Sequence, residues 1–142
     1  AATPVCRMTF ALEGARVLLV EDDPQLRPLL AETLTAAGCS IVLAADGAEA
    51  LRAWPEAGPA PQVLVSDYRL SDTDGVDLLC RLGERWPEAI RILTTSHRSD
   101  DMPPLEERGI RLLRKPFVPE QLLEAIGQGI AAGQTSDVAA EV

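Results

Sequence analysis

Cysteine is scarce in this chain of 142 residues, and its three copies form no recognisable pair. Cys6, Cys39 and Cys80 are odd in number and widely spaced, which argues against both a disulfide framework and a CxxC metal site. Such usage is typical of a reducing compartment. We therefore expect a cytoplasmic protein whose thiols are inert.

Long apolar runs and an excess of positive charge are also lacking. No stretch approaches the roughly 18 apolar residues that span a bilayer, and the first residues do not resemble a signal peptide. We expect a soluble protein that is neither exported nor inserted in a membrane. Its 13 basic residues are outnumbered by 22 acidic ones, giving a net charge of −9, so its surface should repel nucleic acid. If DNA is involved, another domain must bind it.

Lysine is almost absent. All the basic residues are arginine except Lys115, which directly precedes Pro116. A GC-rich coding bias would explain the arginines. Chance would account for one retained lysine, but so would a need for a compact, mobile point charge at that position.

Short apolar runs alternate with helical patterns along most of the chain. With 46% hydrophobic residues, the chain can bury a core as one domain. The runs predict five strands, at 15–20, 41–44, 62–67, 90–95 and 110–113. We expect an N-terminal extension over 1–14, the folded domain over 15–132 and a flexible tail over 133–142.

Five helices are predicted between and after these strands. Asp23 is placed to cap a helix that begins at Pro24 and ends before Gly38. The remaining helices are a second one capped by Asp46, a third opened by Asp74-Gly75, a short one started by Pro103 or Pro104, and a last one from Pro119 to about Ala132. This alternation predicts a single, doubly wound α/β domain with a parallel sheet covered on both faces.

Polar residues follow four of the predicted strands. Glu21 and Asp22 follow the first, Asp67 ends the third, Ser96 follows the fourth and Lys115 follows the fifth. In an open parallel sheet these ends meet at one edge, where ligands bind. Three close carboxylates favour a bound cation, and an oxygen-only ligand set favours Mg²⁺.

The same arrangement would suit a phosphoryl group on Asp67. The metal ion and Lys115 would neutralise the added charge, and Ser96 would donate a hydrogen bond to a phosphoryl oxygen. An aspartate after a strand is more often a turn former or a helix cap, so this interpretation depends on the other strand ends.

From about Arg16 to Ile130, the chain resembles a response-regulator receiver domain of two-component signalling. The resemblance is carried by the motifs Val-Glu-Asp-Asp, Ser-Asp-Tyr-Arg-Leu, Asp-Gly, a serine after the fourth strand, and Arg-Lys-Pro-Phe. The spacings from Asp22 to Asp67 and from Asp67 to Ser96, 45 and 29 residues, are ordinary for that family. The resemblance implies a flavodoxin-like (βα)5 fold with strand order 2-1-3-4-5.

Roles for individual residues follow from this resemblance. It implies Asp67 as both the phosphoacceptor and a metal ligand, with Asp22 as a direct Mg²⁺ ligand, Glu21 as its partner and Arg69 as a ligand through its backbone carbonyl. Ser96 takes the switch hydroxyl position. Lys115 pairs with the phosphoryl oxygens, and a cis bond before Pro116 directs it. The donor would be a histidine kinase or a histidine phosphotransfer domain, and the chain would catalyse only its own phosphorylation and dephosphorylation.

Several residues depart from the family pattern. The switch position that is aromatic in many members is Leu112, which leaves the readout and the dimer surface open. The proline usual four residues after the acceptor is Ser71. Ser96 and Lys115 are only 19 residues apart, and prolines fall where the fourth helix should start, so that helix should be short or reshaped. His97 would hinder water from reaching an acyl phosphate.

The same residues admit other interpretations. A calcium loop around Asp72 and Asp74 fails because its register puts Leu70 first and Arg81 twelfth. A magnesium-dependent aspartyl-phosphate phosphatase would have an acid where Arg69 stands. A receiver-like interaction module that works without phosphorylation remains the alternative. Ala1–Leu12 loosely resembles the end of a kinase ATP-binding domain, which favours the receiver of a hybrid histidine kinase over a free-standing regulator; an effector domain in a longer chain also stays open.

Overall fold

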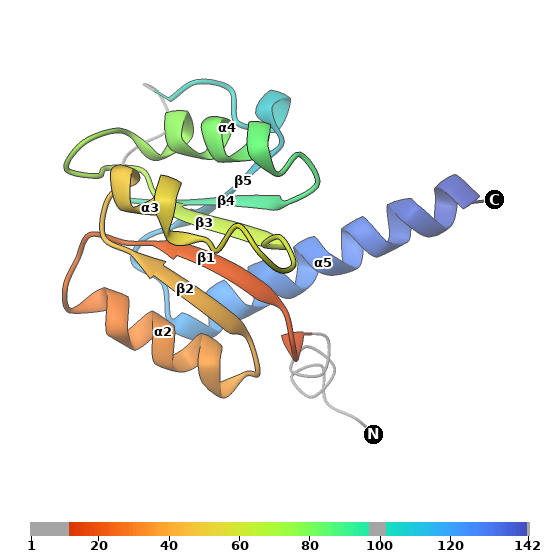
Figure 1. The fold of residues 1–142 in the computed structure, drawn as a ribbon, viewed down its shortest axis with the longest axis horizontal. Helices are drawn as coiled ribbons and strands as arrows, with labels where there is room; N and C mark the ends of the chain where they lie inside the picture. The colour runs from red at the N-terminus through yellow and green to blue at the C-terminus, as the bar shows by residue number, and fades with distance from the viewer. Residues whose placement is uncertain (1–11, 97–101, 142) are drawn as a thin grey trace.

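The strands form where the apolar runs predicted them. The structure, a computed structural model, describes residues 12–96 and 102–141. Its five strands are β1 (Arg16–Val20), β2 (Ser40–Ala44), β3 (Val63–Asp67), β4 (Ile90–Thr95) and β5 (Ile110–Arg114). All neighbouring strands are parallel, in the order β2-β1-β3-β4-β5 (Figure 1). The predicted doubly wound sheet and its strand order are confirmed.

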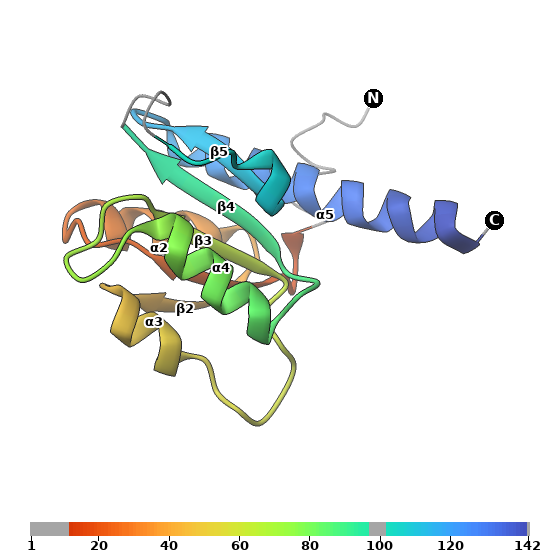
Figure 2. The same cartoon turned by 90° about the horizontal axis from the view of Figure 1, so that it is seen from above.

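Helices cover both faces of the sheet. Figures 1 and 2 show α2 (Leu26–Ala36) and α5 (Pro119–Glu141) on one face, with α3 (Gly47–Ala53) and α4 (Gly75–Arg85) on the other. Each face has its own apolar cluster, because successive side chains of a strand point to opposite faces. Leu19 of β1 packs beneath α2 and α5, and its neighbour Leu18 packs beneath α3 and α4.

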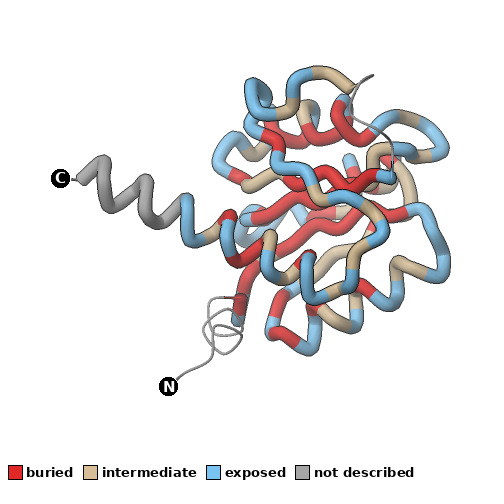
Figure 3. The backbone as a smooth tube through the Cα atoms, turned by 180° about the vertical axis from the view of Figure 1, so that it is seen from behind, coloured by how far each residue is buried: buried red, intermediate tan, exposed pale blue. Residues whose placement is uncertain are grey.

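The two central strands are the most deeply buried elements. Every residue from Val17 to Val20 and from Val63 to Ser66 is buried. The buried colour of the tube in Figure 3 accordingly gathers in the strands of the sheet. Strands covered on both faces bury nearly every side chain, which explains the continuous apolar runs in the sequence. These rigid strands carry the polar residues that follow them.

Three helix starts agree with the sequence, including that of α5 at Pro119, and one differs. Asp46 and Asp74 each accept a hydrogen bond at 2.8 Å from the backbone N–H three residues later, so both predicted caps are confirmed. The first helix begins at Leu26 rather than at Pro24. Asp23 still accepts the N–H of Gln25 at 2.8 Å, so it stabilises the turn that leads into the helix.

The short or reshaped helix expected between β4 and β5 is present as a single turn, whereas the expected end of the last helix was wrong. Within residues 102–109 the chain forms only a short 3₁₀ turn, η2 (Glu106–Arg108), which begins after the prolines at 103 and 104 rather than at them. Residues 97–101, which include His97, lie outside the described part. The last helix continues past Ala132 to Glu141, since Gly133 weakens a helix without stopping it.

The N-terminal expectations lie largely outside the described part, because the structure is described from residue 12 onward. Leu12 itself is buried in the cluster beneath α2 and α5, and Gly14 donates its N–H to the carbonyl of Gly38 at 2.8 Å. Among the helices that are described, none combines the length and apolar character needed to cross a bilayer.

Candidate functional site

The carboxyl ends of β1, β3 and β5 bring four charged residues together. Glu21 and Asp22 directly follow β1, Asp67 is the last residue of β3, and Lys115 follows β5. The strands are parallel and adjacent in the order β1, β3, β4, β5, so these ends meet at one edge of the sheet. The predicted convergence is present for these four residues.

Three carboxylates form an acidic cluster at this edge. One carboxylate oxygen each from Glu21, Asp22 and Asp67 lies within 4.8 Å of the other two. Glu21 is buried, Asp67 is partly buried and Asp22 is exposed, so the cluster opens to solvent on the side of Asp22. Oxygen ligands at this spacing on an open edge fit a hydrated Mg²⁺ ion, and these residues could hold one.

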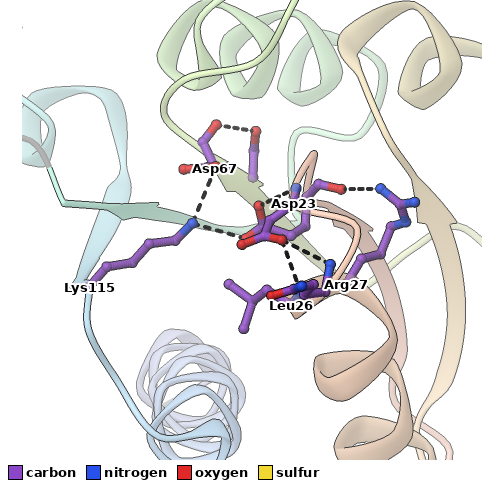
Figure 4. Close-up of polar contacts among 8 residues, drawn as sticks. Asp23, Leu26, Arg27, Asp67 and Lys115 are labelled. Atoms are coloured by element: carbon purple, nitrogen blue, oxygen red, sulfur yellow. Dashed lines mark hydrogen bonds and ion pairs between the residues drawn. The ribbon is translucent and has the colours of Figure 1, made fainter.

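Lys115 bridges the two less exposed carboxylates. Its Nζ lies 3.0 Å from Oε1 of Glu21 and 3.2 Å from Oδ2 of Asp67. A dashed line in Figure 4 joins Lys115 to Asp67. The peptide bond between Lys115 and Pro116 is cis, as the family resemblance implied. The single lysine of the chain therefore sits against the proposed acceptor.

The site perturbs the ionisation of its members. Burial, together with the charge of Glu21, raises the pKa of Asp67 from 3.8 to about 7, against the opposing effect of Lys115. Burial lowers the pKa of Lys115, but its hydrogen bond to Glu21 and the negative charge of Asp67 outweigh burial and raise that pKa overall. A cation beside these carboxylates would relieve their repulsion.

Glu21 is held by contacts that the sequence did not predict. Its Oε2 accepts the N–H of Asp23 at 3.2 Å, and its backbone carbonyl accepts a hydrogen bond from Nη1 of Arg27 at 2.9 Å (Figure 4). These contacts fix the loop between β1 and α2. Arg27 follows Glu21 by six residues across a loop, a spacing that no regular periodicity singles out.

The chain after Asp67 turns sharply into α4. Gly75 donates its N–H to the carbonyl of Tyr68 at 2.6 Å. A Cβ on Gly75 would collide with the carbonyl oxygen of Asp67 and would lie 2.7 Å from Cδ1 of Leu93. The glycine of the Asp-Gly motif is therefore needed for this close approach, which keeps the acceptor against the start of the helix.

The other predicted site residues lie nearby without joining the Lys115 contacts. Ser96 is exposed just beyond β4, while the preceding Thr95 is buried and accepts the N–H of Lys115 at its carbonyl, at 2.8 Å. Arg69 follows β3 and pairs with Asp74 in an isolated bridge. Leu112 on β5 is 37% exposed.

Asp72 has a role that sequence reasoning missed. Its two carboxylate oxygens accept the N–H groups of Gly47 and Ala48, at 2.9 and 2.8 Å, so it caps α3 from a loop 25 residues away. These two hydrogen bonds lower the pKa of Asp72. Asp72 and Asp74 thus cap two different helices, which explains the paired acids without calcium.

Comparison with known proteins gives one consistent family. Residues 17–127 match the family model of the response regulator receiver domain. The chain is 32% identical over 120 residues to the sensor protein TorS of Escherichia coli, covering 84% of this chain and 13% of TorS. It is 33% identical over 118 residues to the transcriptional regulatory protein GlrR of the same species, covering 82% and 26%. It therefore spans about a quarter or less of these relatives.

Solved structures support the same fold. A response regulator receiver domain protein from Clostridium thermocellum superposes with a TM-score of 0.76 at 24% identity, covering 85% of this chain and 98% of that one. At this level of identity the match concerns the fold alone.

Proposed function

The chain belongs to the response-regulator receiver family of two-component systems, and from this premise we propose that Asp67 accepts a phosphoryl group from a phosphohistidine. The observation that carries the proposal is the contact of Lys115 with Asp67 and Glu21, at 3.2 and 3.0 Å, beside three carboxylates within 4.8 Å. This arrangement supplies a nucleophile, a cation and ligands for a metal ion at one strand edge.

The proposed reaction is an in-line transfer. A carboxylate oxygen of Asp67 attacks the phosphorus, a new P–O bond forms, and the P–N bond breaks with its electron pair returning to the histidine ring. Lys115 neutralises charge on the phosphoryl oxygens. The proposed metal ligands are Glu21, Asp22, Asp67 and the backbone carbonyl of Arg69. When bound there, Mg²⁺ would supply further charge neutralisation. Positioning supplies the remaining rate enhancement.

Ser96 is the proposed switch residue, whose hydroxyl donates a hydrogen bond to a phosphoryl oxygen on Asp67. Thr95 is a second candidate, because its carbonyl already accepts the N–H of Lys115 and its side chain is buried at the same strand end. Ser96→Ala and Thr95→Val remove one hydroxyl each and distinguish the two. The variant that loses the phosphorylation-dependent change of conformation identifies the switch residue.

The proposed partner is a histidine kinase or a histidine phosphotransfer domain in the cytoplasm, where ATP is available. Two exposed apolar side chains lie on segments that follow site residues in the chain: Leu29, on the helix after Glu21 and Asp22, is 49% exposed, and Val118, three residues after Lys115, is 56% exposed. Exposed apolar residues on such segments suit a protein partner. Since the relatives are longer, an effector or kinase domain in a longer chain is part of the proposal.

The proposal distinguishes this domain from an enzyme that turns over outside substrates. A magnesium-dependent aspartyl-phosphate phosphatase would need an acid at the position of Arg69. The alternative is an interaction module that works without phosphorylation, and it is favoured by Leu112 and by the 3₁₀ turn in place of a full helix.

Intact-mass measurement tests the proposal against this alternative. The protein is incubated with Mg²⁺ and a small phosphoryl donor, in parallel with Asp67→Asn. The expected result is a gain of one phosphate in the wild-type chain only, dependent on the metal ion. No gain in the wild-type chain, or the same gain in Asp67→Asn, would favour the interaction module or another acceptor.

A further inference from the structure

The loop between β3 and α4 is attached to a helix that is distant in sequence. Asp72, at the tip of this loop, accepts the N–H groups of Gly47 and Ala48 at the start of α3, at 2.9 and 2.8 Å. Both carboxylate oxygens are used, one for each N–H. The attachment is therefore specific for a side chain with two acceptors in a fork.

The surface of α3 is shaped to receive this loop. A Cβ on Gly47 would lie 2.6 Å from the methyl carbon of Thr73 and 3.2 Å from Oδ1 of Asp72. Real side chains do not tolerate the first distance, so only glycine allows the loop to approach this closely. The contact between the loop and the start of α3 therefore depends on Asp72 in the loop and on Gly47 in the helix.

The loop is closed on itself, so its tip and its base move together. Leu70 donates its N–H to the carbonyl of Thr73 at 3.1 Å, and Arg69 pairs with Asp74 across the loop. Arg69 is only two residues from the acceptor Asp67. A constraint on Asp72 is therefore transmitted to the backbone of Arg69.

We propose that Asp72 is a positioning residue for the phosphorylation site: by attaching the loop to α3, it holds the backbone carbonyl of Arg69 where that carbonyl can bind the metal ion. This inference rests on the proposed function, which makes Arg69 a metal ligand. The competing explanation is that Asp72 only caps α3 and stabilises the fold.

Asp46 provides a matched control. Its Oδ1 accepts the N–H of Glu49 at 2.8 Å, so it caps the same helix, but it belongs to the chain of the helix itself. Asp46→Ala weakens the start of α3 and leaves the loop attached. Asp72→Ala weakens the same helix and releases the loop.

The experiment compares wild type, Asp72→Ala, Asp72→Asn and Asp46→Ala in two measurements. The first is amide hydrogen exchange of Leu70 in metal-free protein, and the second is the Kd for Mg²⁺ alone, by calorimetry. We expect Asp72→Ala to accelerate the exchange of Leu70 about tenfold and to raise the Kd about tenfold. Asp72→Asn, with one acceptor oxygen left, should give intermediate values, and Asp46→Ala should change both by less than about twofold.

Equal effects of Asp72→Ala and Asp46→Ala on both measurements would overturn the proposal and leave Asp72 as a helix cap. Should Asp72→Ala fail to fold, Asp72→Asn carries the same comparison. A wild-type protein that binds no Mg²⁺ would reject the proposed function and the metal-positioning role with it. Exchange of Leu70 would still decide whether Asp72 holds the loop.

Discussion

Replacing Asp67 with asparagine should stabilise the metal-free protein. Asparagine has nearly the shape of protonated aspartate and carries no charge. In the wild-type protein the ionised carboxylate lies beside Glu21, largely out of water, and its pKa is about 7 instead of 3.8. Ionising Asp67 therefore costs more in the folded state than in the unfolded chain, and the variant avoids this cost.

The size of the effect follows from the two pKa values. A group whose folded pKa is raised binds its proton more tightly in the folded state, so the wild-type protein loses stability as the pH rises from about 4 to about 7. The full difference corresponds to about 4 kcal/mol, at about 1.4 kcal/mol per pH unit. Because solvent reaches part of the side chain and screens its charge, we expect Asp67→Asn to be about 1–2 kcal/mol more stable above pH 7.

Urea unfolding between pH 4 and pH 8, without divalent metal, measures this difference. The two proteins should be about equally stable near pH 4 and should diverge as the pH approaches 7. Asp22→Asn is the control, because it removes the same charge from an exposed member of the cluster; it should change stability by less than about 0.5 kcal/mol. Adding Mg²⁺ should stabilise the wild-type protein and narrow the gap.

A gap between wild type and Asp67→Asn that stays constant from pH 4 to pH 8 would refute this reasoning. It would mean that the site does not penalise the ionised Asp67, and the physical argument for a cation among the carboxylates would fail with it.

Three further predictions concern residues around the acceptor. Lys115→Met leaves Glu21 and Asp67 without their cation and should destabilise the metal-free protein by about 2–4 kcal/mol at pH 8 in urea unfolding; a loss below about 1 kcal/mol would contradict it. Asp72→Asn should destabilise the protein at pH 7. The difference in unfolding free energy between variant and wild type should vanish as the pH falls through the lowered folded pKa of Asp72, below 3.8, because protonation then removes the charged acceptor from the wild type too. A difference that persists in acid would argue against this. Gly75→Ala should lower the unfolding free energy by about 1–3 kcal/mol through collision with the carbonyl of Asp67, and unchanged stability would show that the chain relaxes there.

Much of the fold follows from local patterns in the sequence. The continuous apolar runs of β1 and β3 predict strands covered on both faces, and Asp46 and Asp74 predict their helix starts through hydrogen bonds within three residues. Each of these signals depends only on residues that are close together in the sequence. The predictions made from them therefore do not depend on how distant parts of the chain pack.

What the sequence missed depends on contacts between distant segments. Asp72 caps a helix that lies 25 residues earlier, and Lys115 contacts Glu21 across the sheet, 94 residues away along the chain. The positions of the charged residues at strand ends predicted that they would lie at one edge of the sheet. These positions did not predict which of the charged groups would form ion pairs. The end of α5 was missed for a different reason, because glycine is a weak stop signal in a helix.

The central claim is that Asp67 receives the phosphoryl group, and the most direct test is to locate that group chemically. The protein is phosphorylated with a small donor and Mg²⁺, then treated with borohydride, which reduces an aspartyl phosphate to homoserine, and its peptides are analysed by mass spectrometry. The account predicts homoserine at position 67 and at no other aspartate. Reduction at another aspartate, or phosphate retained on a hydroxyl or histidine side chain, would contradict it.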